Sequence, residues 1–409
     1  MRTPAYQLPF AAPERQERVD WLMLAALGGL MAVGAFFVYS ATMVSEAAAT
    51  IAWYNQPWVR QVIWYALGGV ALGIVCLVDY RVLSRWSIVI YWGTILLLIA
   101  VLIPGLGSTQ GWGARRWIDL GFFSIQPSEF AKLGFIVAMA NFLSRPPDEL
   151  KSVRIFWQAL GMTVLPFLLI LREPDLGSAL ILLPVGLTML FVAGVPPRYI
   201  NTLIGVSSLL VVLILVDVLF APPQWQIKLE AYQKRRLLVY FGLDGAPRNA
   251  SPAERAEARR VQRDYSYNVD QALISVGSGG LTGKGWRQGT QNALGYLPRS
   301  VAHNDFIFSV LAEEQGFAGV LVALGLYLFV ILRSLEAARL AKDRFGSYLV
   351  LGVLASFTFQ VVYNITMSAG LAPVKGLTLP LMSYGGSSMI ATLAAFGLVL
   401  NVRMRRFTN

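Results

Sequence analysis

Cysteine, histidine and charged residues are all scarce in this sequence. Its 409 residues include one cysteine and one histidine, and only 14% of them are charged. The single cysteine, Cys76, excludes an intramolecular disulfide, and one histidine with one cysteine excludes a metal cage built from these ligands. The sequence also lacks a glycine-rich phosphate loop and a dinucleotide-binding fingerprint, which disfavours ATP-driven transport and nicotinamide chemistry.

Apolar residues, by contrast, are in excess. They make up 56% of the chain, and the mean hydropathy is +0.57, a balance that is untypical of a soluble domain. A bilayer core of about 30 Å requires about 20 apolar residues per helical crossing, and such windows recur along the chain. The sequence therefore predicts an all-α, polytopic membrane protein with ten transmembrane helices in one membrane domain, 21–402. The predicted spans are 21–43, 59–78, 83–104, 125–143, 155–171, 176–195, 199–220, 305–333, 347–369 and 378–402.

The basic residues fit a topology signal better than nucleic-acid binding. They give a net charge of +11, and with ten crossings most of their clusters fall in segments on one side of the membrane. This pattern predicts a cytoplasmic N-terminal segment, 1–20, and a cytoplasmic C-terminal tail, 403–409. It also predicts a long extracytoplasmic loop at about 221–304, between spans seven and eight. Within this loop we expect an amphipathic surface segment at 225–240 and a solvated helix at 252–263.

Two opposite charges lie near the start of the fourth span. Glu129 and Lys132 are three residues apart, so their side chains are neighbours on one face of a helix. An ion pair is the simplest interpretation, because ionisable groups inside a membrane are costly and are usually paired or functional. The functional alternative is that the pair lines a polar groove and orients a substrate group.

Carboxylates mark the outer mouth of the eighth span. Asp305 follows the only histidine, His303, by two residues. A carboxylate at a membrane rim is a candidate general base, and the competing interpretation is a helix N-cap, which aspartate favours. Glu313 and Glu314 lie deeper in the same span, where structural pairing inside the bundle is the expected role.

Four cations fall on the predicted outer side. Arg115 and Arg116 carry forked guanidinium groups that suit a diphosphate, and snorkelling to lipid headgroups is the alternative. Lys284 lies among glycines that allow a backbone to approach a ligand closely, although a merely flexible loop has the same composition. Lys375 adds a further outer cation. Each signal is weak by itself, but all of them map to one side of the predicted membrane.

Ser383 and Tyr384 begin a glycine- and serine-rich run, 383–388, that interrupts an apolar segment. A broken helix survives in a membrane only where protein or a water-filled cavity satisfies the backbone. Close helix packing through small residues is the alternative explanation. Together with the cations and Asp305, this run outlines an outward-facing polar cleft.

Six sequence blocks, in order and spread over most of the chain, carry a family likeness. They are Gly113-Ala114-Arg115-Arg116-Trp117 through Gly121, Gln126-Pro127-Ser128-Glu129, Pro174-Asp175-Leu176-Gly177-Ser178, Gly277 through Gln291, Asp305-Phe306-Ile307-Phe308 through Glu314, and Pro380 through Ser388. In these blocks the chain resembles the SEDS family (shape, elongation, division and sporulation), whose members include RodA, FtsW and SpoVE. The segment 283–291 is more similar to RodA and 375–380 to FtsW, and we favour a RodA-like protein. Two departures from the family pattern are His303-Asn304, where His-Thr is usual, and an apparent insertion at about 246–264.

The resemblance implies a peptidoglycan glycosyltransferase that polymerises lipid II on the outer face of the bacterial cytoplasmic (inner) membrane, for cell-wall elongation and rod shape. It implies that Asp305 is the essential acidic residue, that Glu129 and Lys132 also matter, and that the partner is a class B penicillin-binding protein transpeptidase. Such an inverting transfer needs a base at the acceptor hydroxyl and cations at the departing diphosphate.

On this basis Asp305 is the expected base, and Glu129 with Lys132 an organising pair. The substrate-binding candidates also include Arg115, Arg116, Lys284, Lys375, Ser383 and Tyr384. No metal site is predicted, and a divalent cation, Mg²⁺ or Mn²⁺, is the one cofactor that the diphosphate chemistry allows.

Two alternatives stay open at this stage. A bundle with intramembrane charges and broken helices is also typical of a transporter, here a lipid II flippase. The second alternative is the division-specific, FtsW-type polymerase. Flipping requires a polar path that is accessible from both sides, whereas the candidate residues lie in the outer half, which favours the enzyme.

Overall fold

The computed structural model describes residues 19–43, 52–109, 115–119, 121, 123–220, 251–297 and 299–407. Within these residues, each predicted span contains one long helix. The helices are α1 (Trp21–Thr42), α3 (Pro57–Leu77), α4 (Tyr80–Leu102), α5 (Pro127–Leu143), α7 (Val153–Arg172), α8 (Leu176–Val192), α9 (Pro197–Phe220), α14 (Ile307–Arg339), α15 (Arg344–Ser368) and α16 (Gly386–Met404). Eight helices in the described part of the chain are long and apolar enough to cross a membrane, and α8 is apolar but shorter. The helical membrane fold is therefore confirmed, and the count of ten crossings stays a prediction.

Aspartate N-caps begin several of the long helices. Asp20, Asp79, Asp175 and Asp343 each accept a hydrogen bond from a backbone N–H at the start of α1, α4, α8 and α15. Each carboxylate thus satisfies a donor that has no partner within the helix. Helices α3, α5 and α9 begin with proline, whose missing N–H costs nothing at this position.

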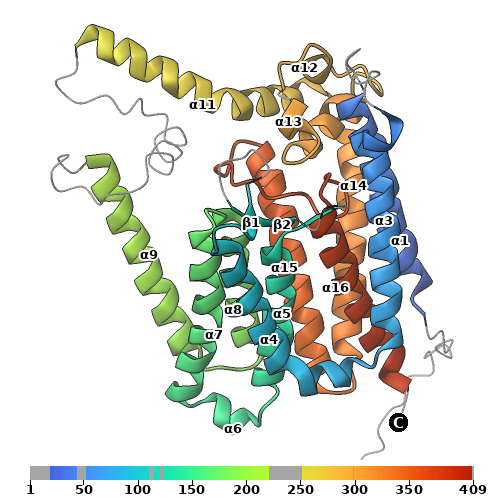
Figure 1. Cartoon of the computed structure of the whole chain (residues 1–409), viewed down its shortest axis with the longest axis vertical. Helices are drawn as coiled ribbons and strands as arrows, with labels where there is room; N and C mark the ends of the chain where they lie inside the picture. The colour runs from blue at the N-terminus through green and yellow to red at the C-terminus, as the bar shows by residue number, and fades with distance from the viewer. Residues whose placement is uncertain are drawn as a thin grey trace, which may run out of the picture.

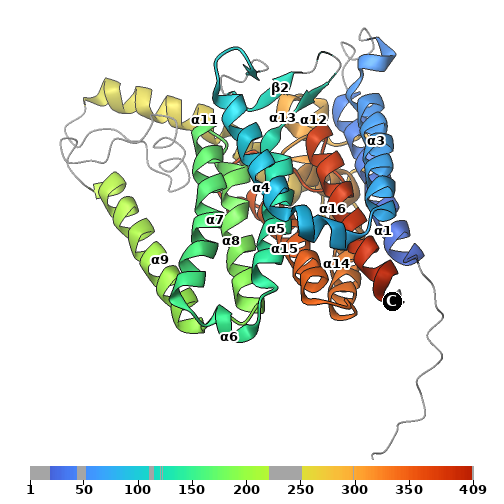
Figure 2. The same ribbon diagram turned by 60° about the horizontal axis from the view of Figure 1, so that its bottom comes forward.

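Helices α15 and α16 form the centre of the bundle (Figures 1 and 2). In the apolar 18-residue stretches of α15 and α16, 56% and 67% of the residues are buried. In the corresponding stretch of α9, only 6% are buried. Helix α16 packs against α3, α14 against α15, and α4 against α5. Helix α9 contacts α8 and stands away from the other helices in both views. The largely buried helices α5, α15 and α16 contact one another.

An ion network joins the first and last long helices at the lower end of Figure 1. The carboxylate of Asp20 lies 2.7 Å from Arg333 Nη2 and 3.2 Å from Arg403 Nε. Burial acts to raise the pKa of Asp20, but the hydrogen bonds from Arg333 and Met23 N–H and the charge of Arg403 outweigh it and hold this pKa below its ordinary value. The two ends of the bundle's chain therefore lie on the same side.

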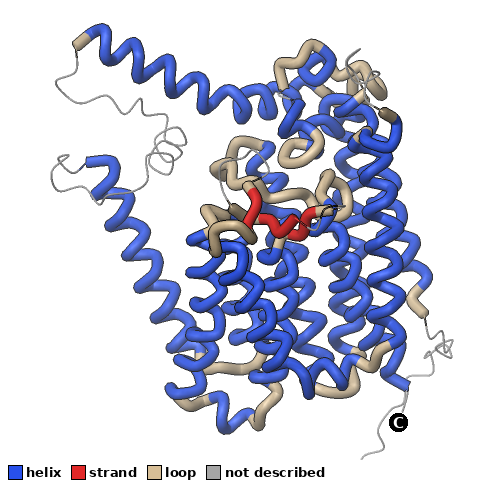
Figure 3. Tube along the Cα trace, viewed as in Figure 1, coloured by secondary structure: helices blue, strands red, loops and turns tan. Residues whose placement is uncertain are grey.

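A small sheet that the sequence did not predict lies below α12 and α13 in Figure 1, next to α4. Strands β1 (Gly107–Ser108), β2 (Trp117–Asp119) and β3 (Ser124–Ile125) pair antiparallel in the order β1-β2-β3, with Ile118 opposite both Gly107 and Ile125. Figure 3 shows the strands in red across the ends of the helices. Strands of this length have no readable alternation of apolar and polar residues, so the all-α prediction missed them.

The segment before α14 contains three helices, α11 (Pro252–Ser278), α12 (Thr290–Ala293) and α13 (Arg299–Ala302). The predicted helix at 252–263 begins at the expected proline but continues to Ser278. The second half of α11 packs on α14 and α15 and buries Ala272 and Ser275. Because of this packing, the helix continues beyond the solvated part that was predicted. The predicted surface segment at 225–240 lies outside the described residues, as does part of the apparent insertion at 246–264.

The last predicted span, 378–402, begins too early. Helix α16 starts at Gly386, and the residues before it form an irregular stretch that we call the 376–385 loop. Gly376 and Leu381 adopt positive φ angles of 69° and 67°, and Pro380 cannot donate a backbone hydrogen bond. Hydropathy alone extended the helix through this loop, because most of its residues are apolar.

Buried side chains from the surrounding helices satisfy the carbonyl groups of the 376–385 loop. The hydrogen bonds run from Gln61 Nε2 to Ser383 O (3.1 Å), Tyr65 Oη to Leu381 O (3.0 Å), Tyr327 Oη to Pro380 O (2.6 Å) and Asn364 Nδ2 to Leu377 O (2.6 Å). This is the condition under which an irregular backbone is stable at membrane depth. The irregular backbone expected near 383–388 is therefore present and is held by protein, but it precedes α16 instead of interrupting a helix, and 386–388 are helical.

Replacing Tyr327 with Phe should lower the stability of the protein. The ring is 2% exposed, and its hydroxyl is a donor to Pro380 O, so the variant leaves a buried carbonyl unsatisfied at a cost of about 1 kcal/mol. Thermal unfolding in detergent should show a lower Tm. Tyr348→Phe is the matched control, because the Tyr348 hydroxyl makes no hydrogen bond within the described residues. Equal Tm values for the two variants would contradict the expectation.

Candidate active site

Asp305 lies between α13 and α14, at the upper end of the bundle. Its N–H donates to Val301 O (2.9 Å), and its carbonyl accepts from Asn364 Nδ2 (2.9 Å). The N-cap position of α14 is occupied by Phe306, one residue after Asp305. The residue is half-buried. The main chain of Asp305 is thus fixed on both sides.

The start of the 376–385 loop lies against this carboxylate. A Cβ at Gly376 would be 3.9 Å from Oδ2 of Asp305. The preceding residue, Lys375, is half-buried, and its carbonyl oxygen would be 2.5 Å from a Cβ at Gly177 in the first turn of α8. Only glycine permits this approach at Gly177. The loop is therefore held between α8 and Asp305, which brings Lys375 into the neighbourhood of the predicted base.

The serine and tyrosine that begin the predicted interruption have different roles. Tyr384 donates its N–H to His303 O (2.9 Å), and the two rings meet edge to face with centroids 5.3 Å apart. Ser383 is 2% exposed, and its Oγ accepts from Leu379 N (2.8 Å). The structure therefore brings Tyr384 to the segment that carries Asp305, whereas the Ser383 hydroxyl stabilises the turn of its own loop.

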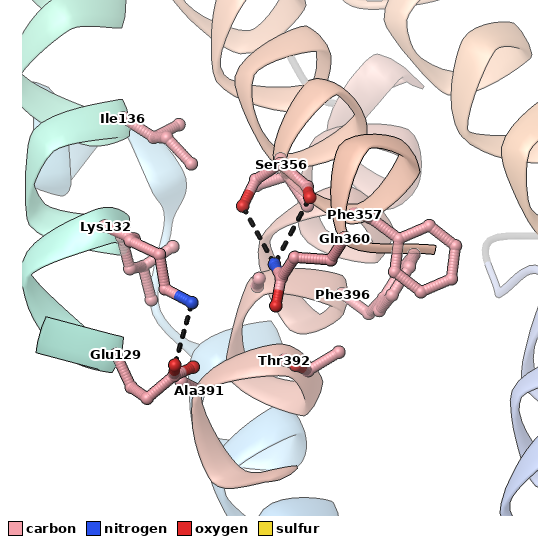
Figure 4. Close-up of a pocket in the computed structure, with 12 residues that line it drawn as sticks. Glu129, Lys132, Ile136, Ser356, Phe357, Gln360, Ala391, Thr392 and Phe396 are labelled. Carbon is pink, nitrogen blue, oxygen red and sulfur yellow. Dashed lines mark hydrogen bonds and ion pairs between the residues drawn. The ribbon is translucent and has the colours of Figure 1, made fainter. Parts of the chain in front are cut away.

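Glu129 and Lys132 form the predicted ion pair, in a cavity between α5, α15 and α16 (Figure 4). Lys132 Nζ lies 2.8 Å from Glu129 Oε1, and the two residues are 5% and 8% exposed. Across the cavity, the Gln360 amide donates to the carbonyl and hydroxyl oxygens of Ser356 (3.2 Å each). The cavity volume is about 40 Å³. Because one water needs about 10–15 Å³ of such volume, this space accommodates a few waters but no sugar ring.

The start of α5 is bound to the starts of α8 and α16. Gln126 donates its N–H to Ser387 Oγ (3.0 Å) and its side-chain amide to Asp175 Oδ2 (2.8 Å), and Ser128 Oγ donates to the same carboxylate (3.3 Å). Sequence reasoning missed Asp175 as a site residue. Its position before an apolar helix predicts an N-cap, but nothing in its spacing points to α5. This carboxylate therefore connects the start of α5, the helix that carries the ion pair, to the start of α8.

The outer arginines differ in their contacts. Arg116 donates from Nε to Glu173 O (3.2 Å) and from Nη2 to Pro174 O, so its guanidinium ties β2 to the connection between α7 and α8. Arg115 is exposed. Of this pair, the structure leaves Arg115 as the residue that faces outward, and it gives Arg116 a structural attachment.

Lys284 contacts the carboxylate of Glu313, which lies within α14 and not at the start of that helix. Its Nζ lies 2.6 Å from Oε1 of Glu313, which is fully buried. Glu314 Oε1 accepts from Ser40 Oγ (2.5 Å). The structural pairing predicted for the two glutamates is therefore confirmed. Within the described residues no three His, Cys, Asp or Glu side chains are grouped so that they could hold a metal ion.

Comparison with known proteins extends these observations to the whole chain. A family model described as cell cycle protein (FtsW, RodA, SpoVE) matches residues 20–407. The peptidoglycan glycosyltransferase MrdB of Escherichia coli is 36% identical over 379 residues, which cover 92% of this chain and 93% of that protein. The probable peptidoglycan glycosyltransferase FtsW of Geobacter metallireducens is 35% identical over 95% of this chain and 96% of its own length.

A solved structure gives the same result for the fold. One chain of a peptidoglycan synthase complex that coordinates polymerization and crosslinking superposes with a TM-score of 0.74 at 29% identity, and the match covers 96% of this chain and 99% of that chain. This chain belongs to the SEDS family. The resemblance identified from the sequence blocks is confirmed. The identities to the MrdB and FtsW relatives are nearly equal, so the preference for a RodA-like member stays a prediction.

One further carboxyl of this SEDS protein stands out by its isolation. Glu173, between α7 and α8, is fully buried, and among the described residues neither of its side-chain oxygens has a hydrogen-bond partner. Burial raises the pKa of Glu173 to about 9, the charge of Asp175 adds to the rise, and Arg116 opposes it. This pKa keeps the side chain protonated at pH 7, beside Arg116 and Asp175.

Glu173→Gln should stabilise the protein in a pH-dependent way. Between the ordinary pKa of 4.5 and about 9, the folded protein keeps a proton on Glu173 that the unfolded chain has lost. Wild-type stability therefore falls as pH rises through this window, by at most about 1.4 kcal/mol per unit, and the glutamine variant lacks this loss. The Tm difference in favour of the variant should grow from pH 5 to pH 9. Exposed Glu149, replaced with Gln, is the control, and a Tm difference that is constant with pH would refute the expectation.

Proposed function

We propose that this SEDS protein polymerises lipid II into peptidoglycan glycan strands, with Asp305 as the general base. Peptidoglycan glycosyltransferase is the activity for which the curated relatives are named. The observation that carries the assignment is the setting of Asp305. Its main chain is fixed by α13 and Asn364, and its carboxylate faces the loop that carries Lys375 and Gly376.

The reaction follows from this geometry. Asp305 accepts the proton of the acceptor sugar's 4-hydroxyl as the oxygen attacks C1 of the donor sugar, and the bond from C1 to the lipid diphosphate breaks with inversion at C1. The departing diphosphate accumulates negative charge, which nearby cations stabilise. Arg115, which faces outward, and Lys375, beside Gly376, are the candidates for this contact. Arg116 is attached to backbone carbonyls and has a supporting role.

The Glu129–Lys132 pair acts on the scaffold and not on the sugar. Its cavity is too small for a sugar ring, and it lies between the three helices that meet under the 376–385 loop. Both partners belong to α5, and removing one would leave an uncompensated charge on the face of α5 that meets α15 and α16. Intact, the pair allows these helices to pack on that face. It thereby organises the elements that hold Asp305 and Lys375.

The proposed location is the bacterial cytoplasmic membrane, with the Asp305 end outside and both termini in the cytoplasm. The same-side position of Asp20 and Arg403 supports an even number of crossings. We propose a class B penicillin-binding protein as the partner, since the structurally similar chain comes from a complex that couples polymerization to crosslinking. Any divalent cation would bind with the diphosphate, because the described residues offer no preformed cage of His, Cys, Asp or Glu.

Asp305→Ala should abolish polymerisation of purified lipid II in detergent, with a loss of at least about 100-fold, because no base then accepts the hydroxyl proton. Gel analysis of the glycan products measures the loss. The control is Asp148→Ala, which removes an exposed carboxylate at the lower end of the bundle. Wild-type polymerisation by the Asp305 variant would exclude the assignment. Absence of polymer from the wild-type protein and its partner, with transport of lipid II in vesicles, would favour the flippase.

A further inference from the structure

Helix α14 consists of two parts. Gly316 has φ 61° and ψ −161°, which breaks the helix and leaves a short first part, 307–315, that is almost completely buried. Asp305 lies just before the first end of this part, and Glu313 and Glu314 lie at the second end. The orientation of this short part therefore determines where the carboxylate of Asp305 is presented.

A glycine-rich segment, 279–289, fills the break, and we call it the docking loop. Two of its N–H groups, of Lys284 and Gly285, donate to the carbonyls of Glu313 (3.0 Å) and Glu314 (2.9 Å). Beyond the break the docking loop accepts hydrogen bonds instead. The N–H groups of Phe317 and Ala318 donate to Gly280 O (2.9 Å) and Leu281 O (3.0 Å). The docking loop thus bonds the peptide groups that the break would leave unpaired, on both of its sides.

Backbone lies directly on backbone in this contact. A Cβ at Gly279 would be 1.9 Å from Ala312 O, and one at Gly283 would be 2.2 Å from Glu314 O. A Cβ at Gly316 would be 2.3 Å from Gly283 N. No side chain fits at these positions, which explains the glycine content of a segment that the sequence alone also allows to be a flexible loop.

The ammonium group of Lys284 binds acceptors inside the contact between the docking loop and α14. Its ammonium group donates to Glu313 Oε1 (2.6 Å), Ser278 Oγ (2.8 Å) and Thr290 Oγ1 (2.6 Å), so each of its three N–H bonds has a protein acceptor. Glu313 is fully buried, and the same oxygen also accepts from Gln291 N (3.0 Å). The ammonium group of Lys284 thus meets a fully buried carboxylate between the docking loop and α14.

The other side of the docking loop is fixed to α1. The ring of Trp286 stacks on Tyr39 with centroids 5.8 Å apart, and Arg287 Nη2 donates to Met43 O (3.2 Å). Asn292, which follows the loop, donates to Ser40 O (3.2 Å). The docking loop therefore connects the first part of α14 to the end of a different long helix.

From these contacts we propose that Lys284 is a positioning residue: by neutralising Glu313 it locks the docking loop into the break of α14 and so fixes the short helix that presents Asp305. The inference rests on the proposed role of Asp305 as the base. It replaces the diphosphate contact that the sequence suggested for Lys284, because the donors that such a contact requires already have acceptors in the protein.

A double-variant cycle separates the two roles of Lys284. Lys284→Met leaves Glu313 buried without its cation, and we expect kcat for lipid II polymerisation to fall at least about 10-fold while KM changes little. Lys284→Met combined with Glu313→Gln removes both charges and should restore kcat to within about threefold of wild type. Lys151→Met, an exposed lysine at the lower end of the bundle, is the matched control.

The alternatives give different results. If Lys284 contacts the diphosphate, the double variant stays as inactive as Lys284→Met, and that result overturns the proposal, as does full activity of Lys284→Met. Hydrogen exchange at the amides of 284–285 and 317–318, measured on the same folded proteins, should be faster in the single variant and normal in the double. This readout does not depend on catalysis, so it still tests the docking loop if Asp305→Ala proves active and the proposed function fails.

Discussion

A peptide group inside a membrane protein must find a partner within the protein, and both irregular segments near Asp305 are built around this constraint. The 376–385 loop gives its carbonyls to buried side chains of α3, α14 and α15. The break of α14 at Gly316 gives its peptide groups to the docking loop. Because each irregular segment is satisfied by a different element, the site is rigid only when these elements are assembled together.

Buried charges are likewise paired within the protein, in three places. Lys132 pairs with Glu129 between α5, α15 and α16, Lys284 pairs with Glu313 between the docking loop and α14, and Asp20 pairs with two arginines at the lower end. Such pairs add little net stability, but each carboxylate tolerates one arrangement of its neighbours only. The Asp20 network and the Lys284–Glu313 pair join separate elements and so specify which of them meet, whereas the Glu129–Lys132 pair lies within α5.

Local patterns predicted part of the site correctly. The Glu129–Lys132 pair follows from helical spacing, and the pairing of Glu313 follows from the cost of a charge in a span. The partner of Glu313 did not follow, since Lys284 is 29 residues away in the chain. The same limit applies to Asp175, whose capping role is local while its contacts to the start of α5 are not. When a side chain has one partner nearby in the chain and another far away, the sequence pattern indicates only the nearby partner.

The sequence by itself determined the helical membrane fold, the positions of the long helices and the family, because length, hydropathy and ordered motifs are properties of the chain. Only the tertiary structure decided where the last helix begins, which cations are already paired and how Asp305 is held. Apolar composition cannot distinguish a helix from a loop whose carbonyls are bonded by distant side chains. Nor can it distinguish a lysine that awaits an anion from one that a buried glutamate has already bound.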